Sequence, residues 1–210
     1  MDLKVILSNR QEIAVVSALD FESVFGVRYL NQIEYGSART QKVLENKYRK
    51  AQRKGWITAR QKWLGHYYKQ IPPPLLTISW IDAEVGYGVF AREKIAGRRW
   101  IGAYTGILRK RRFFKRWENL YCFDYTIGES RSTSYVIDAQ NAGNHTRFIN
   151  HSFDPNVGLV SIDNGQKIDV ILYALKEILP GDQLLYDYGE EYWSKRKSPL
   201  LLSTKEQNKE

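Results

Sequence analysis

The sequence predicts a mainly β protein with a helical N-terminal region. Before residue 70, apolar side chains recur at helical spacing in two neighbouring segments, each behind a residue type that commonly caps a helix. Three consecutive prolines at 72–74 then stop any helix, because proline has no amide hydrogen and clashes with the preceding turn. After them, short apolar runs alternate with glycines, which is typical of strands in small sheets. We therefore expect three parts: a basic, largely helical region over 1–75, a β-rich domain over 76–193 and a tail over 194–210.

Two helices are expected in the first part. Ser37 is a typical helix cap, and the helix that follows it has one apolar face, formed by Leu44, Tyr48 and Ala51. Gly55 interrupts this helix. Thr58 followed by Gln61 has the pattern of a capping box, so a second helix begins there. Its apolar face is formed by Ala59, Trp63 and Tyr67.

The β-rich part contains six short apolar runs that predict strands. They cover residues 76–80, 88–91, 100–104, 135–137, 157–162 and 168–174. Between the last two runs, Asn164-Gly165 predicts a hairpin with a type I′ turn, because both central positions of that turn need a positive φ.

Composition excludes several classes of protein. Cys122 is the only cysteine and the three histidines lack metal-ligand spacing, so we expect no disulfide framework, no zinc cluster and no metal. The longest uncharged stretch, residues 70–81, contains three prolines and is too short to cross a bilayer. The N-terminus lacks the pattern of a classical secretion signal. We expect a soluble protein of the reducing cytoplasm with no membrane partner.

Four short motifs follow one another in the β-rich part. They are Gly86-Tyr87-Gly88, Tyr104-Thr105-Gly106, the segment Gly143 to Asn156 with Arg-Phe-Ile-Asn-His-Ser at 147–152, and Tyr186-Asp187-Tyr188-Gly189. With these motifs in this order, residues 76–193 resemble the SET-domain protein lysine methyltransferases. The resemblance is to the compact, zinc-free type found in bacteria, notably chlamydiae, and in viruses.

This resemblance implies a fold, a cofactor and a set of site residues. The implied fold is a β-fold of small sheets with a C-terminal pseudo-knot, and the implied methyl donor is S-adenosylmethionine, with a protein lysine entering from the opposite face. The implied catalytic residues are Tyr188, Tyr104 and Tyr186. The implied cofactor-binding residues are Gly86, Tyr87, Gly88, Arg147, Asn150, His151 and Trp193, with Arg147 either bracing its segment or touching the donor.

The residue types suit this chemistry. A lysine must lose its proton before it attacks a methyl group, and its reference pKa is about 10.4. An apolar, tyrosine-lined channel disfavours the ammonium form and lowers that pKa. Tyr186 stands where the family has Phe or Tyr, and a hydroxyl there can hold a water in the space of a second methyl group. We therefore expect mainly mono-methylated product.

The sequence departs from the family pattern near the C-terminus. Gln183 replaces a usual glutamate, Phe153 replaces a frequent cysteine, and no cysteine follows Gly189. The zinc-bound segment that many relatives use to complete the lysine channel is therefore not expected. The aromatic pair Tyr192-Trp193 is the expected substitute.

Charge is concentrated in one block that the SET motifs do not include. The chain has 32 Lys and Arg against 23 Asp and Glu, a net charge of +9. Segment 36–69 alone contains ten basic residues and one acidic residue, so it carries the whole excess. Four aromatic side chains are interleaved with these charges: Trp56, Trp63, Tyr67 and Tyr68. A nucleic-acid surface and a homodimer contact are both consistent with this segment.

The expected function is transfer of methyl groups to lysine in a histone or histone-like protein. Two alternatives remain open: a catalytically weak SET-fold module that binds nucleic acid or chromatin, and a methyltransferase for a non-histone protein. Cytoplasmic localisation in the source cell is expected, with delivery to a host nucleus as the alternative if the source is an intracellular bacterium.

Overall fold

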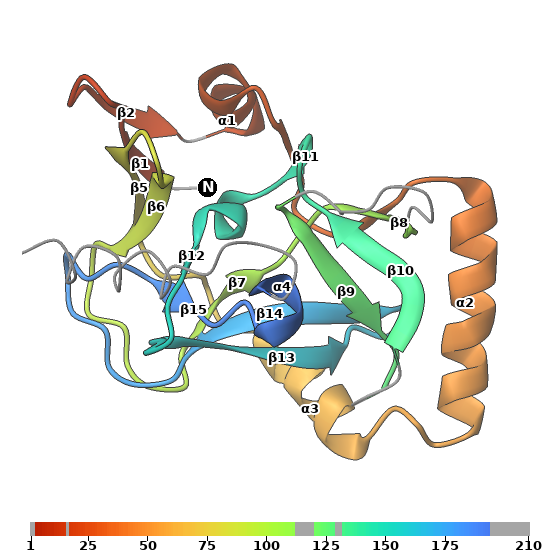
Figure 1. Ribbon diagram of the computed structural model, residues 1–210. Helices are drawn as coiled ribbons and strands as arrows, with labels where there is room; N and C mark the ends of the chain where they lie inside the picture. Colours follow the sequence, from red (N-terminus) through yellow and green to blue (C-terminus); the bar gives the residue numbers. More distant parts are fainter. Residues whose placement is uncertain (1–2, 16, 112–119, 129–131, 194–210) are drawn as a thin grey trace, which may run out of the picture.

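The computed structural model describes residues 3–15, 17–111, 120–128 and 132–193; the tail predicted over 194–210 lies outside this part. The chain is mainly β, and its strands form several small sheets, which confirms the expected fold class (Figure 1). No helix among the described residues is long and apolar enough to cross a membrane.

The strands of the described residues form four sheets. The first has the order β2 (Glu12–Val15), β1 (Leu3–Ile6), β5 (Leu76–Asp82) and β6 (Gly86–Ala91). The second has the order β4 (Glu34–Tyr35), β8 (Ile107–Lys110), β10 (Ser132–Asp138) and β9 (Cys122–Thr126). A two-stranded sheet pairs β11 (Ala142–Gly143) with β3 (Arg28–Tyr29). The fourth has the order β12 (Asn150–His151), β15 (Leu185–Tyr186), β13 (Val157–Asp163), β14 (Ile168–Ala174) and β7 (Trp100–Ala103).

The N-terminal region combines helices with strands that belong to these sheets. Its helices are α1 (Ala18–Phe25), α2 (Ala38–Arg53) and α3 (Ala59–Tyr68). Four strands before residue 75 pair with other strands, and three of the four sheets join a strand from before residue 75 to one from after it. In the first sheet, for example, Leu3 of β1 lies opposite Leu76 of β5 in parallel register. The boundary at 75/76 stays a prediction, and hydrogen bonds cross it in several places.

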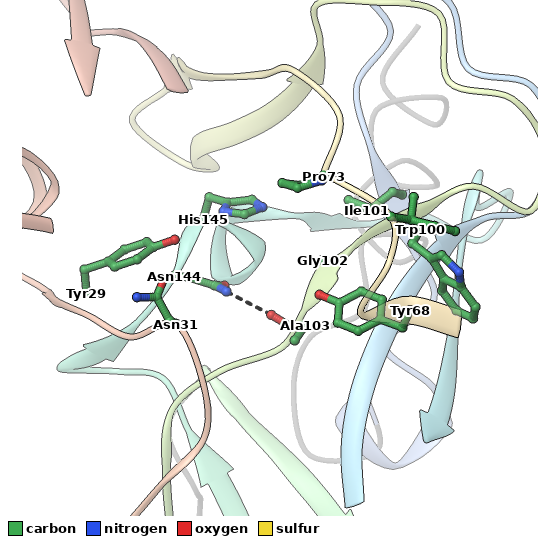
Figure 2. Close-up of a pocket in the computed structure, with 11 residues that line it drawn as sticks. Tyr29, Asn31, Tyr68, Pro73, Trp100, Ile101, Gly102, Ala103, Asn144 and His145 are labelled. Carbon is green, nitrogen blue, oxygen red and sulfur yellow. Dashed lines mark hydrogen bonds between the residues drawn. The ribbon is translucent and has the colours of Figure 1, made fainter. Parts of the chain in front are cut away.

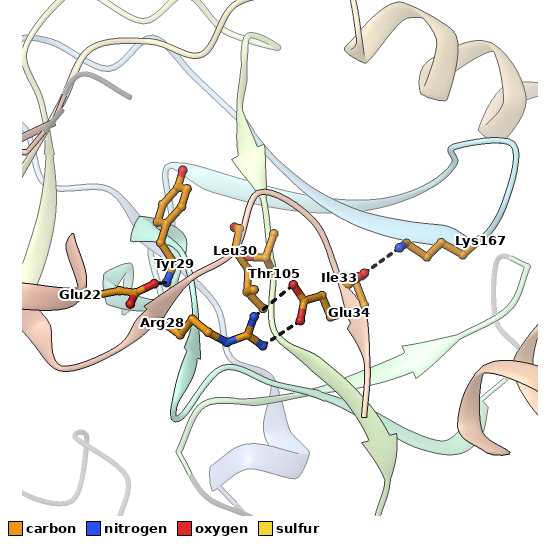
Figure 3. A network of polar contacts seen from close by, with 8 residues as sticks. All are labelled: Glu22, Arg28, Tyr29, Leu30, Ile33, Glu34, Thr105 and Lys167. Atoms are coloured by element: carbon orange, nitrogen blue, oxygen red, sulfur yellow. Dashed lines mark hydrogen bonds and ion pairs between the residues drawn. The ribbon is translucent and has the colours of Figure 1, made fainter. Parts of the chain in front are cut away.

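The connection 28–35 is fastened to the β-rich part by side-chain contacts (Figure 3). The hydroxyl of Thr105 donates to the carbonyl of Leu30 at 3.0 Å. The buried Lys167 donates from Nζ to the carbonyl of Ile33 at 2.6 Å. Within the connection, Arg28 of β3 and Glu34 of β4 form an ion pair with two hydrogen bonds. The N-terminal region is therefore held on the domain at fixed points.

Helix α2 begins and packs as the sequence predicts. The Ser37 hydroxyl accepts a hydrogen bond from the amide of Thr40, and the three apolar residues of its predicted face are buried. Figure 1 shows α2 running along the outside of the molecule beside β8 and β10. Its basic side chains therefore lie on an outer helix.

Helix α3 has the predicted capping box, formed by Thr58 and Gln61, but packs through another face. Trp63 and Tyr67 are 62% and 44% exposed, whereas Gln61 and Gly65 are buried. The reason is steric: a Cβ on Gly65 would lie 1.8 Å from the carbonyl oxygen of Asp163. Glycine lets the helix backbone lie directly on the end of β13, and the larger aromatic side chains are turned outward.

The hairpin between β13 and β14 is confirmed, but the predicted type I′ turn is wrong. Asn164 and Lys167 close the loop through a backbone hydrogen bond of 3.1 Å. Of these loop residues only Gly165 has a positive φ, 92°, and a type I′ turn needs two. The Asn164 side chain instead accepts hydrogen bonds from the amides of Gln166 and Lys167, which stabilises a different turn.

The C-terminal strand β15 is inserted between two earlier strands, as the implied pseudo-knot requires. It pairs in parallel with β12 on one side and with β13 on the other. Just before it, Leu184 donates its amide to the carbonyl of Val89 in β6 at 2.8 Å. This insertion brings the end of the described chain next to β6 and β12, where the glycine motif and the Asn-His motif lie.

Candidate active site

The structure brings the three tyrosines predicted to be catalytic into one cluster. Tyr186 lies on β15 and Tyr188 follows it, with their ring centroids 4.6 Å apart. Tyr104 follows β7 and is buried, 4% exposed. It lies close enough to both other rings to interact with them electrostatically. Two segments far apart in sequence, at residue 104 and residues 186–188, thus meet at one point.

Main-chain carbonyls take up the protons of two of these hydroxyls. Tyr104 donates to the carbonyl of Tyr121 at 2.7 Å, and Tyr188 donates to the carbonyl of Ile149 at 2.9 Å. A phenol has one proton and two acceptor lone pairs. Because both protons are in use, each oxygen can only accept a further hydrogen bond. Such oxygens can orient an amine or a polarised methyl group.

Burial keeps the cluster uncharged. It raises the pKa of Tyr104, Tyr186 and Tyr188 well above the usual value near 10, and the neighbouring tyrosines add to this effect. The phenols are therefore neutral at physiological pH. A neutral, partly apolar surrounding disfavours an ammonium group and favours the free amine.

The glycine motif lies at the start of β6, beside the Asn-His motif of β12. Asn150 donates from Nδ2 to the carbonyl of Tyr87 at 3.1 Å. A Cβ on Gly88 would lie 2.7 Å from the side chains of Ile81 and Gln183. A side chain at Gly88 would have to displace the ends of these two side chains, and Asn150 lies beside them, with its Nδ2 3.2 Å from the same Cβ position.

His151 adjoins the tyrosine cluster and is held in one tautomer. Its Nδ1 accepts a hydrogen bond from the amide of Tyr188 at 3.1 Å, so the ring proton is on Nε2. Burial lowers the pKa of His151, which keeps the ring neutral. Nε2 is buried and has no hydrogen-bond partner within the described part of the chain. A directed N–H group is thus free to bind a ligand.

Aromatic rings enclose His151. Its ring centroid lies 4.3 Å from that of Phe153 and 4.7 Å from that of Trp193. Trp193 ends α4 (Glu190–Trp193), and its indole Nε1 is also buried and unpartnered among the residues described here. The predicted aromatic tail therefore packs where the glycine, Asn-His and tyrosine motifs meet. The described residues contain no cluster of three or more potential metal ligands.

Arg147 braces the site in the structure. Its Nε donates to the carbonyl of Ala139 at 2.8 Å and its Nη2 to the carbonyl of Gln140 at 3.2 Å. Its guanidinium lies 3.8 Å from the ring centroid of Tyr121, the residue whose carbonyl binds Tyr104. These contacts correspond to the bracing alternative, and contact of Arg147 with a cofactor stays a prediction.

Two residues that hold the site together have no role in the sequence prediction. Asn156 accepts a hydrogen bond from the amide of Leu185 at 2.9 Å and donates one to the carbonyl of Gln183 at 2.8 Å. It therefore fixes the start of β15 and the residues just before it. Tyr121 provides the carbonyl that binds Tyr104. The Pro-Asn pair of the motif is a signal for Asn156, whereas no motif contains Tyr121.

Comparison with known proteins identifies the family. Residues 86–189 match the SET domain. This range runs from the glycine motif to the end of the Asp-Tyr-Gly motif and includes nearly all of the site. Residues 86–189 therefore form a SET domain.

Curated relatives are histone-lysine methyltransferases by name. A probable histone-lysine N-methyltransferase, set-23, of Caenorhabditis briggsae is 33% identical over 118 residues, which cover 51% of this chain and 48% of the relative. An H3 lysine-9 specific enzyme of Schizosaccharomyces pombe is 31% identical over 137 residues, covering 60% of this chain and 27% of the relative. The chain thus matches half or less of each of these relatives.

Two solved structures are similar to part of this chain. KRYPTONITE in complex with DNA, an H3(1-15) peptide and SAH is 28% identical, with a TM-score of 0.48, over 57% of this chain and 24% of that one. A structure described under the product specificity of histone lysine methyltransferases is 25% identical, with a TM-score of 0.49, over 57% and 52%.

Replacing Asn156 should loosen β15. In Asn156→Ala, the amide of Leu185 and the carbonyl of Gln183 lose their partner, so we expect the free energy of unfolding to fall by about 1–3 kcal/mol. Urea denaturation followed by circular dichroism measures this loss. Asn46→Ala, at an exposed position of α2, is the control and should not lower the free energy of unfolding, because alanine favours a helix more than asparagine does. Equal stability of the two variants would contradict the role of Asn156.

Proposed function

We propose that the chain is an S-adenosylmethionine-dependent protein-lysine N-methyltransferase. The observation that carries this proposal is the neutral tyrosine cluster next to the Gly88, Asn150 and His151 arrangement. One part of the site suits a neutral amine, and the adjoining part has free N–H groups for a polar ligand. The relatives named as histone-lysine methyltransferases support the same reaction.

The residues at β6, β12 and α4 fit the methyl donor. Nε2 of His151 and Nε1 of Trp193 are buried N–H groups without partners in the described chain, and their rings offer flat surfaces for an adenine. At Gly86 nothing lies within 4 Å of the position that a Cβ would take, so the backbone there allows close approach of the amino-acid end. When bound, S-adenosylmethionine supplies an activated methyl group on a positively charged sulfur.

The chain's own contribution is alignment and control of protonation. The oxygens of Tyr104 and Tyr188 accept hydrogen bonds from the N–H groups of the substrate amine. The lone pair of the amine then points toward the methyl group. The surrounding rings exclude water and disfavour the ammonium form of the lysine. Holding an amine in this geometry lowers the entropic part of the barrier.

The proposed substrate is a lysine in a histone or histone-like protein. The names of the relatives support a histone, and the S. pombe relative is named for H3 lysine 9. The net charge of +9 would repel a strongly basic tail unless nucleic acid neutralises it. A non-histone protein is therefore the second substrate class to test.

Removing the hydroxyl of Tyr188 should abolish most of the activity. Tyr188→Phe keeps the ring but loses the oxygen that aligns the amine, so we expect the rate of methyl transfer to fall about 100-fold or more. The assay follows label from S-adenosylmethionine into core histones and a lysate of the source organism, with products identified by mass spectrometry.

The matched control for this variant is Tyr35→Phe, which removes a hydroxyl on β4 outside the tyrosine cluster. This variant should keep at least half of the activity. Absence of labelled lysine with every substrate, while the protein still binds the donor, would instead favour the binding-module alternative.

We further propose that Tyr186 limits the product to mono-methyl-lysine. Its hydroxyl makes no hydrogen bond within the described residues, and its ring packs on Tyr188. A hydroxyl in this place can hold a water where a second methyl group would lie. Tyr186→Phe should raise the fraction of di- and trimethyl-lysine, read by product mass. Abundant trimethyl-lysine from the unmodified chain would contradict the proposal.

A second candidate function is binding of nucleic acid by α2 and α3. Trp63 and Tyr67 are exposed and stacked on each other, with centroids 5.2 Å apart and planes at 7°. They lie within the basic segment 36–69. Exposed rings among positive charges suit stacking on bases and contact with phosphates. The structure leaves these two rings outside the core, which is the observation that favours this function.

Affinity for DNA should depend steeply on salt. The logarithm of the association constant should fall with that of salt concentration by about 0.9 per phosphate contact, as measured by fluorescence anisotropy with a labelled duplex. Trp63→Ala should weaken binding, and Leu19→Ala, an exposed apolar residue on α1, should not. Salt-insensitive binding would contradict the proposal, and a concentration-dependent dimer lost in Trp63→Ala would favour a homodimer contact instead.

A further inference from the structure

A pocket lies between the N-terminal region and the β-rich domain (Figure 2). It shares no residue with the candidate active site. Its volume is about 170 Å³. Tyr29 and Asn31 come from the connection 28–35, and Tyr68 comes from the end of α3. The rest of the lining comes from the following segment, β7 and the start of the 3₁₀ helix (His145–Phe148), namely Ile71, Pro73, Trp100, Ile101, Gly102, Ala103, Asn144 and His145.

His145 is the central observation in this pocket. It is only 9% exposed, and both of its ring nitrogens are buried without a hydrogen-bond partner in the part of the chain that the structure describes. Figure 2 shows its ring directed into the space between Tyr29 and Pro73. Gly102 leaves room for it, because a Cβ there would lie 3.3 Å from Nε2. A buried polar group without a partner is unfavourable unless a ligand or solvent satisfies it.

Further polar groups converge on the same space. Figure 2 shows the hydroxyls of Tyr29 and Tyr68 directed inward from opposite sides. Asn144 is already engaged, since its Nδ2 donates to the carbonyl of Ala103 at 2.9 Å. The pocket thus offers several donors and acceptors between flat aromatic rings.

All of these groups are uncharged near neutral pH. The lining contains no Asp, Glu, Lys or Arg. Burial lowers the pKa of His145 to about 4, and it raises the pKa of Tyr68 to about 12. Burial also raises the pKa of Tyr29. An ion would enter this pocket without a counter-charge, which is strongly unfavourable.

We propose that this pocket binds a small uncharged molecule consisting of one planar ring with hydrogen-bonding substituents, the chemical class of a pyrimidine base or nicotinamide. The volume supports one ring, because a cavity of about 150 Å³ holds a benzene molecule. Aromatic walls favour a flat ligand. A neutral imidazole offers one donor and one acceptor, so it suits a ligand that carries both.

Because of the position of the pocket, a bound ligand would connect the N-terminal region to the β-rich domain. The ligand would contact the connection 28–35 and α3 on one side, and β7 and His145 on the other. Binding would therefore tighten the docking of the basic N-terminal region on the domain. This proposal goes beyond the methyltransferase function and does not depend on it.

The test compares two matched pairs of probes on the full chain at pH 7.5. Nicotinamide and uracil are uncharged, whereas nicotinate and orotate have the same rings with an added carboxylate. Titration calorimetry and saturation-transfer NMR should show that at least one uncharged probe binds at millimolar concentration. Its carboxylate partner should bind at least ten-fold more weakly.

Two variants test whether the probe binds in the pocket around His145. His145→Phe keeps a ring of similar shape and removes both nitrogens, which have no partner in the described chain, so the fold should persist. Asn31→Ala removes the amide of an exposed residue that lines the pocket from the connection 28–35. Each should weaken binding at least ten-fold, with circular dichroism confirming the fold. Failure of both uncharged probes to bind, equal binding of the carboxylates, or unchanged binding in His145→Phe would each overturn the proposal.

Discussion

Insertion of residues 183–188 between β12 and β13 is the constraint on which the rest of the site depends. Asn156 holds the first part of this segment through Gln183 and Leu185. Tyr188 is then fixed by its amide to His151 and by its hydroxyl to the carbonyl of Ile149. One short segment thereby places two of the three tyrosines, selects the tautomer of His151 and brings α4 over the histidine ring. Without it, the glycine and Asn-His motifs would not adjoin Tyr186 or Tyr188.

Burial then determines the chemistry of the site. The hydroxyl protons of Tyr104 and Tyr188 are used by backbone carbonyls, and burial keeps both phenols neutral. The result is a group of oxygen acceptors in a surrounding that disfavours positive charge on an amine. The part of the site around His151 and Trp193 offers hydrogen-bond donors instead. Both side chains have buried N–H groups without a partner in the described chain. Two adjoining regions with complementary hydrogen-bonding capacity suit one reaction between two ligands.

Local signals in the sequence predict α2, α3 and several strands of the β-rich part, but not α1 or the strands β1 to β4 of the N-terminal region. The expectation that the motifs meet at one site comes from the resemblance to the SET-domain proteins. The capping residues of α2 and α3 and the strands after the prolines follow from residue type and spacing. The remaining features depend on contacts between segments that are distant in the sequence. Trp63 faces solvent because Gly65 lets the helix backbone touch Asp163, a long-range contact that no pattern within α3 reveals. The partners of Asn156 and the carbonyl of Tyr121 lie on other segments, so their roles need the folded chain. The pocket around His145 is likewise assembled from four separate segments.

The most direct test of the central claim is a crystal structure of the chain with S-adenosylhomocysteine and a lysine peptide. The proposed site requires the adenine to lie against His151 and Trp193, with the sulfur facing the hydroxyl oxygens of Tyr104 and Tyr188 and the lysine entering from the other side. A cofactor bound elsewhere, or a lysine nitrogen held away from these two oxygens, would contradict it.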